Sequence, residues 1–238
     1  MEDVERLVDK RTKAISVSAV AFGNGFRCNL SEIGKLCKDK GILFVVDGIQ
    51  ALGAMDLKVT ESFVDVLSAD AHKWLLGPQG IGILYVSDRA LEKLNVSNLG
   101  WRSMEGESDY LDYTIRLKAG APRFEEGTLN VMGIAGLKAS LEMILNIGIS
   151  KIEKRIIYLC DLISGGLTRN GYDLKSPMER GERSGILNFA ADKVPSQEIM
   201  DKLKDAGVVC AIRDGGVRVS PHFYNDESDI NSFFKILP

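Results

Sequence analysis

An aspartate and a lysine, two residue types that can act on one ligand, each follow a run of apolar residues. Asp47 closes the run Ile42–Asp47, which has the composition of a strand buried on both faces, and Lys73 follows a second strand candidate, Val64–Asp70. Open α/β sheets bind ligands at the carboxyl ends of their strands. We therefore expect Asp47 and Lys73 to lie at one ligand-binding edge.

A carboxylate and an amine suit pyridoxal phosphate, a cofactor that uses both groups. A lysine forms a Schiff base with its aldehyde, and a carboxylate keeps the ring nitrogen protonated so that the ring accepts electrons. The spacing alone also fits a plainer interpretation. Aspartates at strand ends are common, and the stem of Lys73 can simply lie along an apolar surface.

Polar residues next to this pair could complete a cofactor site. Gln50 could hydrogen-bond the phenolic oxygen of the cofactor, although a single glutamine is more often a surface amide. His72 stands beside Lys73, and together with Asp70 and Ser68 it could help to place the phosphate group.

The order of apolar runs and helical patterns predicts the fold class. Strand-like runs alternate with a helical pattern that ends at Gly41, which indicates an α/β sheet covered by helices. A loop-rich region, a buried helix and an amphipathic helix with Ser150 as its cap follow, and beyond Gly171 shorter elements indicate a small α+β unit. The expected strands are 13–22, 42–47, 64–70, 81–87, 185–191, 208–213 and 216–221; the expected helices are 30–41, 129–149, 150–171, 195–207 and one from 226; the loop-rich region is 95–126.

The overall composition excludes several classes of protein. The 238 residues are 45% hydrophobic and carry a net charge of −3, so no general field attracts nucleic acid or an anionic membrane. Four widely spaced cysteines without a C-x-x-C pair argue against a metal site and for a reducing compartment. No apolar stretch approaches the ~20 residues of a membrane span, and no signal peptide opens the sequence. We expect a cytoplasmic protein that binds neither nucleic acid nor membrane.

Four segments, in order, carry a resemblance to a known family. They are LFVVDGIQALGAMDLKV, DVLSADAHKWLLGPQGIGILYV, PRFEEGTLNVMGIAGLKASLEMI and VRVSPHFYND. The chain resembles the class V aminotransferases, the fold-type I group that contains cysteine desulfurases and isopenicillin N epimerase-like enzymes. The resemblance implies a pyridoxal-phosphate-dependent transferase-like α/β fold. A partial cofactor-binding large domain with a mainly parallel sheet would span 1–148, and a linker helix with a small C-terminal α+β domain would span 149–238.

The resemblance also assigns roles to individual residues. Lys73 resembles the catalytic lysine that forms the Schiff base, Asp47 the partner of the ring nitrogen, and Gln50 the contact of the phenolic oxygen. His72 is similar to a residue near the phosphate. Asn24 is similar to an asparagine beside the cofactor, although between two glycines it is more often a turn residue.

Three further residues take roles from the resemblance. Gly127 and Thr128 resemble a Gly-Thr pair that, in family homodimers, reaches the phosphate bound by the other subunit; they could instead only cap a helix, with Thr128 as the cap. Arg218 resembles the arginine that binds the α-carboxylate of an amino-acid substrate, a bidentate task that suits guanidinium, but it could also face solvent. His222 is assigned to packing or capping.

The chain departs from the cysteine desulfurases in one stretch. Those enzymes carry a nucleophilic cysteine in a loop shortly before the substrate arginine, but here CAIRDGGVRVSP contains a tight Asp-Gly-Gly turn without a cysteine. Cys210 lies in the preceding strand-like run, where a small buried hydrophobe is expected. The turn disfavours a persulfide-forming desulfurase and favours epimerase-type or general aminotransferase-type members.

The second departure is that the chain begins where the middle of a family member should be. The missing half would supply a phosphate-binding turn and a residue stacked on the ring, so exposed apolar surface and a need for dimerisation are expected. Two functions stay open: an enzyme that transaminates, racemises or eliminates from an amino acid, and a truncated, catalytically incomplete family member or subunit. DAHKWL is also similar to group II decarboxylases, but the other segments fit class V better.

Overall fold

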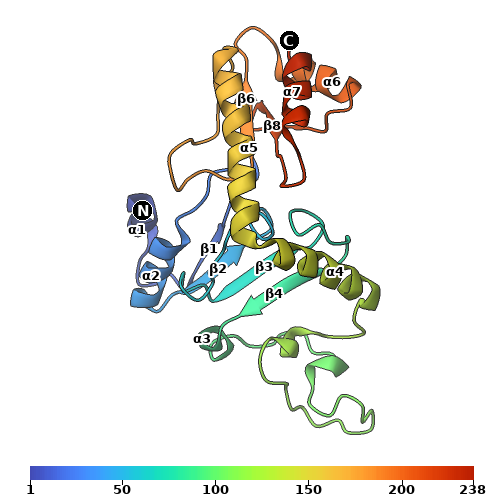
Figure 1. The fold of residues 1–238 in the computed structure, drawn as a ribbon. Helices are drawn as coiled ribbons and strands as arrows, with labels where there is room; N and C mark the ends of the chain where they lie inside the picture. The colour runs from blue at the N-terminus through green and yellow to red at the C-terminus, as the bar shows by residue number, and fades with distance from the viewer.

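The structure, a computed structural model, describes residues 1–238 and contains two four-stranded sheets (Figure 1). The long helix α5 (Ile149–Arg169) runs from the first sheet to the second. The first sheet has the order β1-β2-β3-β4, with β1 Ala14–Ser18, β2 Leu43–Asp47, β3 Val66–Asp70 and β4 Gly82–Val86. Its helices are α1 Glu2–Leu7, α2 Leu30–Lys40, α3 Asp88–Leu91 and α4 Val131–Ile147, and the loop-rich region contains the 3-10 helices η1 Trp101–Ser103 and η2 Ala121–Phe124.

The first sheet is mainly parallel, as predicted. Strands β1, β2 and β3 run parallel to one another, and β4 is antiparallel to β3. The register sets Ser18 beside Asp47 and Asp47 beside Ser68. The carboxyl ends of the three parallel strands therefore meet at one edge of the sheet, and the segment that carries Lys73 leaves from this edge.

One face of the first sheet forms the main core. Phe44, Val46 and Leu67 occupy alternate positions on this face and are at most 2% exposed. Helix α5 contributes Ile152 and Ile156 to the same cluster of buried apolar residues. Burial of each such side chain stabilises the fold by about 1.5–3 kcal/mol, so this face fixes the position of β2 and β3.

The opposite face of the first sheet is open. Ser18, Asp47, Ser68 and Asp70 alternate with the core residues and are exposed, and Leu84 on β4 is 45% exposed. Because successive side chains of a strand point to opposite faces, the burial of Val46 on one side places Asp47 on the other. The predicted ring-nitrogen partner thus lies on an exposed sheet face.

Helices α4 and α5 meet at a bend of 80°. The predicted Ser150 cap is wrong: Gly148 adopts a φ of +94°, which favours glycine, and α5 begins at Ile149 without a side-chain cap. Neither helix alone has the length and hydropathy of a membrane span; the two reach those values only when taken together across the bend. The predicted domain boundary after residue 148 coincides with this bend and stays a proposal.

The start of α4 also differs from one interpretation of the sequence. Asn130, not Thr128, is the N-cap, and its side-chain oxygen accepts a hydrogen bond from the backbone N–H of Gly133 at 2.9 Å. The Asn130 side chain also donates to the backbone oxygen of Gly80 at 2.9 Å. Because asparagine offers both an acceptor and a donor, it caps the helix and ties it to the turn before β4, which the Thr128 hydroxyl does not do.

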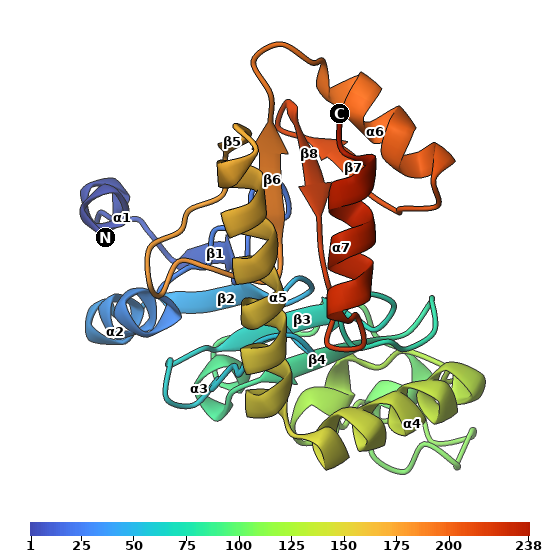
Figure 2. The same cartoon turned by 45° about the horizontal axis from the view of Figure 1, so that its top comes forward.

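The second sheet is antiparallel, in the order β5-β6-β8-β7. Its strands are β5 Asp173–Leu174, β6 Leu187–Ala190, β7 Ala211–Arg213 and β8 Gly216–Val219. Figure 2 shows helices α6 (Ser196–Asp205) and α7 (Glu227–Ile236) beside β7 and β8. This is the small α+β unit that the sequence predicts, and Asp226 caps α7 where the closing helix was expected to begin.

A two-residue turn joins β7 and β8. Asp214 and Gly215 have φ values of +47° and +74°, so both central residues are left-handed. Tight hairpins favour this geometry because its twist matches that of the flanking strands, and Asp-Gly is one of its preferred sequences. The register pairs Arg213 with Gly216 directly across the turn.

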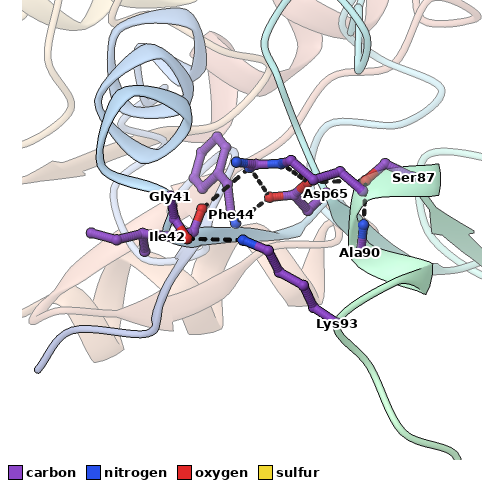
Figure 3. A network of polar contacts seen from close by, with 8 residues as sticks. Gly41, Ile42, Phe44, Asp65, Ser87, Ala90 and Lys93 are labelled. Atoms are coloured by element: carbon purple, nitrogen blue, oxygen red, sulfur yellow. Dashed lines mark hydrogen bonds and ion pairs between the residues drawn. The ribbon is translucent and has the colours of Figure 1, made fainter.

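The buried carboxylate of Asp65 connects several segments at the edge of the first sheet that lies opposite the carboxyl ends of its parallel strands (Figure 3). Asp65 accepts hydrogen bonds from the Phe44 N–H (2.8 Å), the Ser87 hydroxyl (2.9 Å) and Nε of Arg89 (2.8 Å). Lys93 donates to the backbone oxygen of Gly41 at 2.9 Å. Burial alone raises the pKa of Asp65, but the hydrogen bonds from Arg89, Phe44 and Ser87 outweigh it and leave the pKa below its usual value.

Candidate active site

Hydrogen bonds join the two ends of the segment that carries Lys73 and connect this segment to α4. The backbone N–H of Gly77 donates to the oxygen of Ala71 at 2.9 Å. Leu76 has a φ of +55°, an uncommon conformation for leucine, and its backbone oxygen accepts a hydrogen bond from Ser140 on α4 at 2.9 Å. These contacts hold Lys73 in a short, strained loop rather than on a mobile tail.

Trp74, the next residue, is the apolar base of this loop. It is 6% exposed, and its backbone oxygen lies 3.1 Å from Nε2 of His222. A Cβ atom on Gly53 would stand 2.2 Å from the same backbone oxygen, so only glycine permits this approach. Lys73 itself is half-buried. The apolar residues that follow the lysine in the sequence therefore position it.

Lys73 faces a cavity of about 410 Å³, here called the Lys73 cavity. Gln50, from the turn after β2, and Arg218, from β8 of the second sheet, line it, so three of the predicted site residues meet there. The other lining residues are Phe22, Trp74, Leu76, Arg213, Ser220, His222 and Tyr224. The cavity therefore lies at the junction of the two sheets, with contributions from both.

Gln50 has one end of its amide fixed. Its side-chain oxygen accepts a hydrogen bond from the indole N–H of Trp74 at 2.9 Å, and the residue is 8% exposed. An indole N–H can only donate, so this bond orients the amide with its NH₂ group away from Trp74. A donor group is thus available to an acceptor atom in the cavity, as the predicted contact to a phenolic oxygen requires.

Arg218 lies on β8, half-buried, with part of its guanidinium committed to the protein. Its Nη1 donates to the backbone oxygen of Phe22 at 2.8 Å, while its buried Nε has no hydrogen-bond partner. Burial and then the nearby Arg213 lower the pKa of Arg218 from its ordinary value. A half-buried guanidinium whose Nε lacks a partner is suited to bind an anionic group such as a carboxylate.

Asp47 lines a different hollow, of about 430 Å³, on the exposed face of the first sheet. Ser68 and Asp70 line this hollow too, and one carboxylate oxygen of Asp47 accepts from the Ile49 N–H at 2.9 Å. The structure places Asp47 and Lys73 at the same strand-end edge, but it does not bring them into one cavity.

Four other predicted residues line neither hollow. His72 is exposed, with its Nδ1 3.9 Å from the Asp70 carboxylate. Asn24 accepts a hydrogen bond from the Phe26 N–H at 3.0 Å, as expected of a turn residue. Gly127 and Thr128 lie in the segment before α4.

His222 is the clearest residue that the sequence interpretation left aside. Its Nδ1 accepts from the Phe223 N–H at 2.8 Å, so the proton must be on Nε2, which donates to the backbone oxygen of Trp74. Burial lowers the pKa of His222. The ring of Tyr224 stacks on it at 4.9 Å. The neutral imidazole therefore does pack, as predicted, but it also forms part of the cavity wall.

The groups in this region fit the predicted cofactor and substrate. Lys73 offers an amine, Gln50 a free amide donor and Arg218 an unpaired guanidinium nitrogen, while Asp47 offers a carboxylate at the adjoining strand end. This is the set of donors and acceptors that an aldehyde, a phenolic oxygen, a carboxylate and a protonated ring nitrogen would need.

Comparisons with known proteins show the family to which the chain is similar. The sequence model of the family "Aminotransferase class-V" matches residues 1–233. A probable cysteine desulfurase of Pyrococcus abyssi is 29% identical over 250 residues, which cover 100% of this chain and 61% of that protein. The apo structure of a cysteine desulfurase from Thermococcus onnurineus NA1 is 27% identical with a TM-score of 0.85, covering 94% of this chain and 58% of that one.

A third relative shows a cofactor. The structure of a C-DES mutant with glycine covalently linked to its PLP cofactor is similar to this chain with a TM-score of 0.86 and 23% identity, over 98% of this chain and 62% of that one. The predicted α/β fold is thus confirmed as that of pyridoxal-phosphate enzymes. The chain spans about 60% of the length of the curated relatives it matches. By the extent of the family match, this chain belongs to the class V aminotransferases.

Proposed function

We propose that this chain forms part of a pyridoxal-phosphate-dependent enzyme that acts on an amino acid. The observation that carries the proposal is the meeting of Lys73, Gln50 and Arg218 in one cavity, although they come from three distant parts of the chain. When bound, the cofactor supplies an aldehyde for the amine of the substrate and a ring that withdraws electrons from its α-carbon.

The residues would divide the work as follows. Lys73 would hold the cofactor at its aldehyde through Nζ, and the same amine would take and return the α-proton of the substrate. Asp47 keeps the ring nitrogen protonated, and Gln50 donates its amide N–H to the phenolic oxygen. Arg218 binds the α-carboxylate. His72 and Asp70 would stand near the phosphate, and Asn24 beside the ring.

The reaction that follows the common first step would be transamination, racemisation or elimination. Cys210, the cysteine nearest to Arg218 in sequence, lies just before β7 and is half-buried. Burial raises the pKa of its thiol, which lowers the fraction of reactive thiolate. We therefore propose a reaction without a persulfide on a loop cysteine, nearer to that of the epimerase-type members.

We further propose that the enzyme is a cytoplasmic homodimer with a shared active site. Helix α4 supports the dimer, because Val131, Met132 and Leu145 are between 68% and 84% exposed. Gly127 and Thr128 lie just before α4. If a second subunit covers α4, these two residues would approach the phosphate site of that second subunit.

A second candidate is a family member that lacks part of the site. It is favoured by the position of Asp47, which lies on an exposed sheet face in a hollow separate from Lys73. In that case the chain would keep the fold but would require another polypeptide to hold the cofactor.

Mixing the purified chain with pyridoxal phosphate tests these two functions. The first predicts a visible absorption band and, after borohydride reduction, a stable mass addition on the peptide that contains Lys73. Lys73→Ala should lose both signals, whereas Lys154→Ala, at an exposed position on α5, should keep them. No band in protein whose circular dichroism shows it to be folded would reject the first function for the isolated chain and favour the second.

A further inference from the structure

The Lys73 cavity is lined by three positively charged side chains and by no carboxylate. Lys73, Arg213 and Arg218 all line it, and the remaining lining residues are neutral. Neither arginine has a carboxylate oxygen within 4.0 Å of its side-chain nitrogens anywhere in the chain. Binding one α-carboxylate at Arg218 would leave the second guanidinium uncompensated.

The hairpin register explains why the two arginines meet. Arg213 lies opposite Gly216, and Arg218 lies opposite Ala211. Residues two apart on a strand share a face, so Arg213 and Arg218 are diagonal neighbours on the same face of the hairpin. Their cross-strand partners are the two smallest residue types, and these leave the space above this face to the guanidinium groups.

Arg213 keeps free donors for a ligand. One of its guanidinium nitrogens donates to the backbone oxygen of Ile212 at 2.7 Å, and no other side-chain contact uses the group. The neighbouring carboxylate of Asp214 forms no ion pair with either arginine; one of its oxygens would stand 1.8 Å from a Cβ atom on Gly23. The Asn188 amide donates to the backbone oxygens of Arg213 (2.7 Å) and Gly23 (3.0 Å), which fixes the hairpin against the turn at Gly23.

Two adjacent guanidinium groups without a counter-ion repel each other, and one of them, Arg218, is half-buried while Arg213 is exposed to solvent. The buried Nε of Arg218 has no hydrogen-bond partner. Burial lowers the pKa of Arg218, and the positive charge of Arg213 lowers it further. A ligand with two anionic groups would satisfy both arginines at once, and charge-assisted hydrogen bonds of this kind are among the stronger ones in proteins. A ligand with one carboxylate and an apolar side chain would place that side chain beside Arg213.

We propose that the substrate is an amino acid whose side chain carries a second carboxylate, and that Arg213 binds this group while Arg218 binds the α-carboxylate. The assignment rests on the proposed function, since it gives a substrate class to the same site. Arg213 is then the residue that determines side-chain specificity.

Titration calorimetry with succinate and butyrate tests the proposal without any turnover. The two acids have the same number of carbon atoms and differ in one carboxylate. With the chain loaded with pyridoxal phosphate, and again without the cofactor, succinate should bind at least about tenfold more tightly than butyrate, the effect of one charged hydrogen bond. Arg213→Gln should reduce succinate affinity to that of butyrate and leave butyrate unchanged, whereas Arg218→Gln should weaken both.

Arg169→Gln is the matched control, because it removes an exposed arginine at the end of α5 and should change neither affinity. Equal affinities for the two acids, or equal losses for both in Arg213→Gln, would overturn the proposal. If Arg213→Gln instead weakens cofactor binding and succinate shows no preference, Arg213 serves the cofactor phosphate and the proposal also fails. Failure of the proposed function is separate: it appears as a missing visible band, whatever the calorimetry of the cofactor-free chain shows.

Discussion

Trp74 donates its indole N–H to the side-chain oxygen of Gln50 at 2.9 Å, directly beside the lysine that the site is built around. This bond links the segment after β2 to the segment after β3. It also determines which end of the Gln50 amide is available in the cavity. The residue that supports Lys73 from below therefore also orients its nearest amide neighbour.

Replacing this tryptophan tests the arrangement. Trp74→Phe keeps an aromatic base but removes the donor, so the buried oxygen of Gln50 loses its partner, at a cost of about 1–3 kcal/mol in the free energy of unfolding. The dissociation constant of pyridoxal phosphate should rise as well, because the amide is free to turn. Urea unfolding and cofactor titration measure the two effects. Trp101→Phe, at a tryptophan that is 42% exposed, should alter neither.

The contact between Gly53 and Trp74 gives a second test. Gly53 has a φ of +93°, and a Cβ there would stand 2.2 Å from the backbone oxygen of Trp74. Gly53→Ala should therefore destabilise the fold and shift the segment that holds Lys73, with weaker cofactor binding as the result. Gly41→Ala is the control, since Gly41 has a φ of +68° with nothing within 4 Å of the new atom. The control should show only the backbone strain of about 1–2 kcal/mol; equal effects at the two positions would show that the contact with Trp74 is unimportant.

The buried carboxylate at the other end of the sheet should govern stability rather than binding. Asp65→Asn leaves Arg89 without its counter-ion; because the Asp65 side chain is buried and the Arg89 side chain is 31% exposed, the loss should be about 1–3 kcal/mol. The same substitution in the exposed pair of Asp3 and Arg6, whose side chains are 85% and 77% exposed, should cost less than about 1 kcal/mol. Chemical denaturation of both variants checks the difference, and similar losses would contradict the structural role of Asp65.

Stability should depend on pH through His222. Burial lowers the pKa of His222 in the folded state, so below about pH 6.5, the ordinary value for the unfolded chain, the unfolded state binds more protons. The stability contributed by the neutral ring is thus complete above that pH. It is lost as the pH falls from there towards the folded-state pKa. The melting temperature, followed from pH 8 to pH 5, should fall more steeply for the natural chain than for His222→Gln.

Much of the fold was predictable because local patterns coincide with burial. Ile42–Val46 is apolar without a break, and a strand is found there at the sheet centre; the expected burial on both faces is wrong, because only one face of this strand is fully buried. Helix ends were less predictable. Asn130 rather than Thr128 caps α4, since a cap depends on which side chain also reaches a neighbouring turn, here at Gly80. No local pattern contains that information.

In the site too, some residues could be predicted from the sequence and one could not. Lys73, Gln50 and Arg218 could be named from the sequence because their segments resemble those of a family, and the structure brings these three into one cavity. Arg213 was missed, although a signal was present: two strand-like runs separated by Asp-Gly, each with an arginine. Its relevance became visible only with the register, which places Arg213 and Arg218 on the same face.

The two-residue turn of Asp214 and Gly215 has a consequence for insertions and deletions. Side chains alternate along a strand, so the number of residues between two positions decides whether they share a face. If the two-residue turn is kept, gain or loss of a single residue between the two arginines would shift the pairing by one and send one guanidinium to the opposite side of the hairpin. A change of two residues would preserve the pair. Natural length variants of this hairpin that keep the two-residue turn should therefore differ by even numbers of residues between the two arginines wherever both are kept.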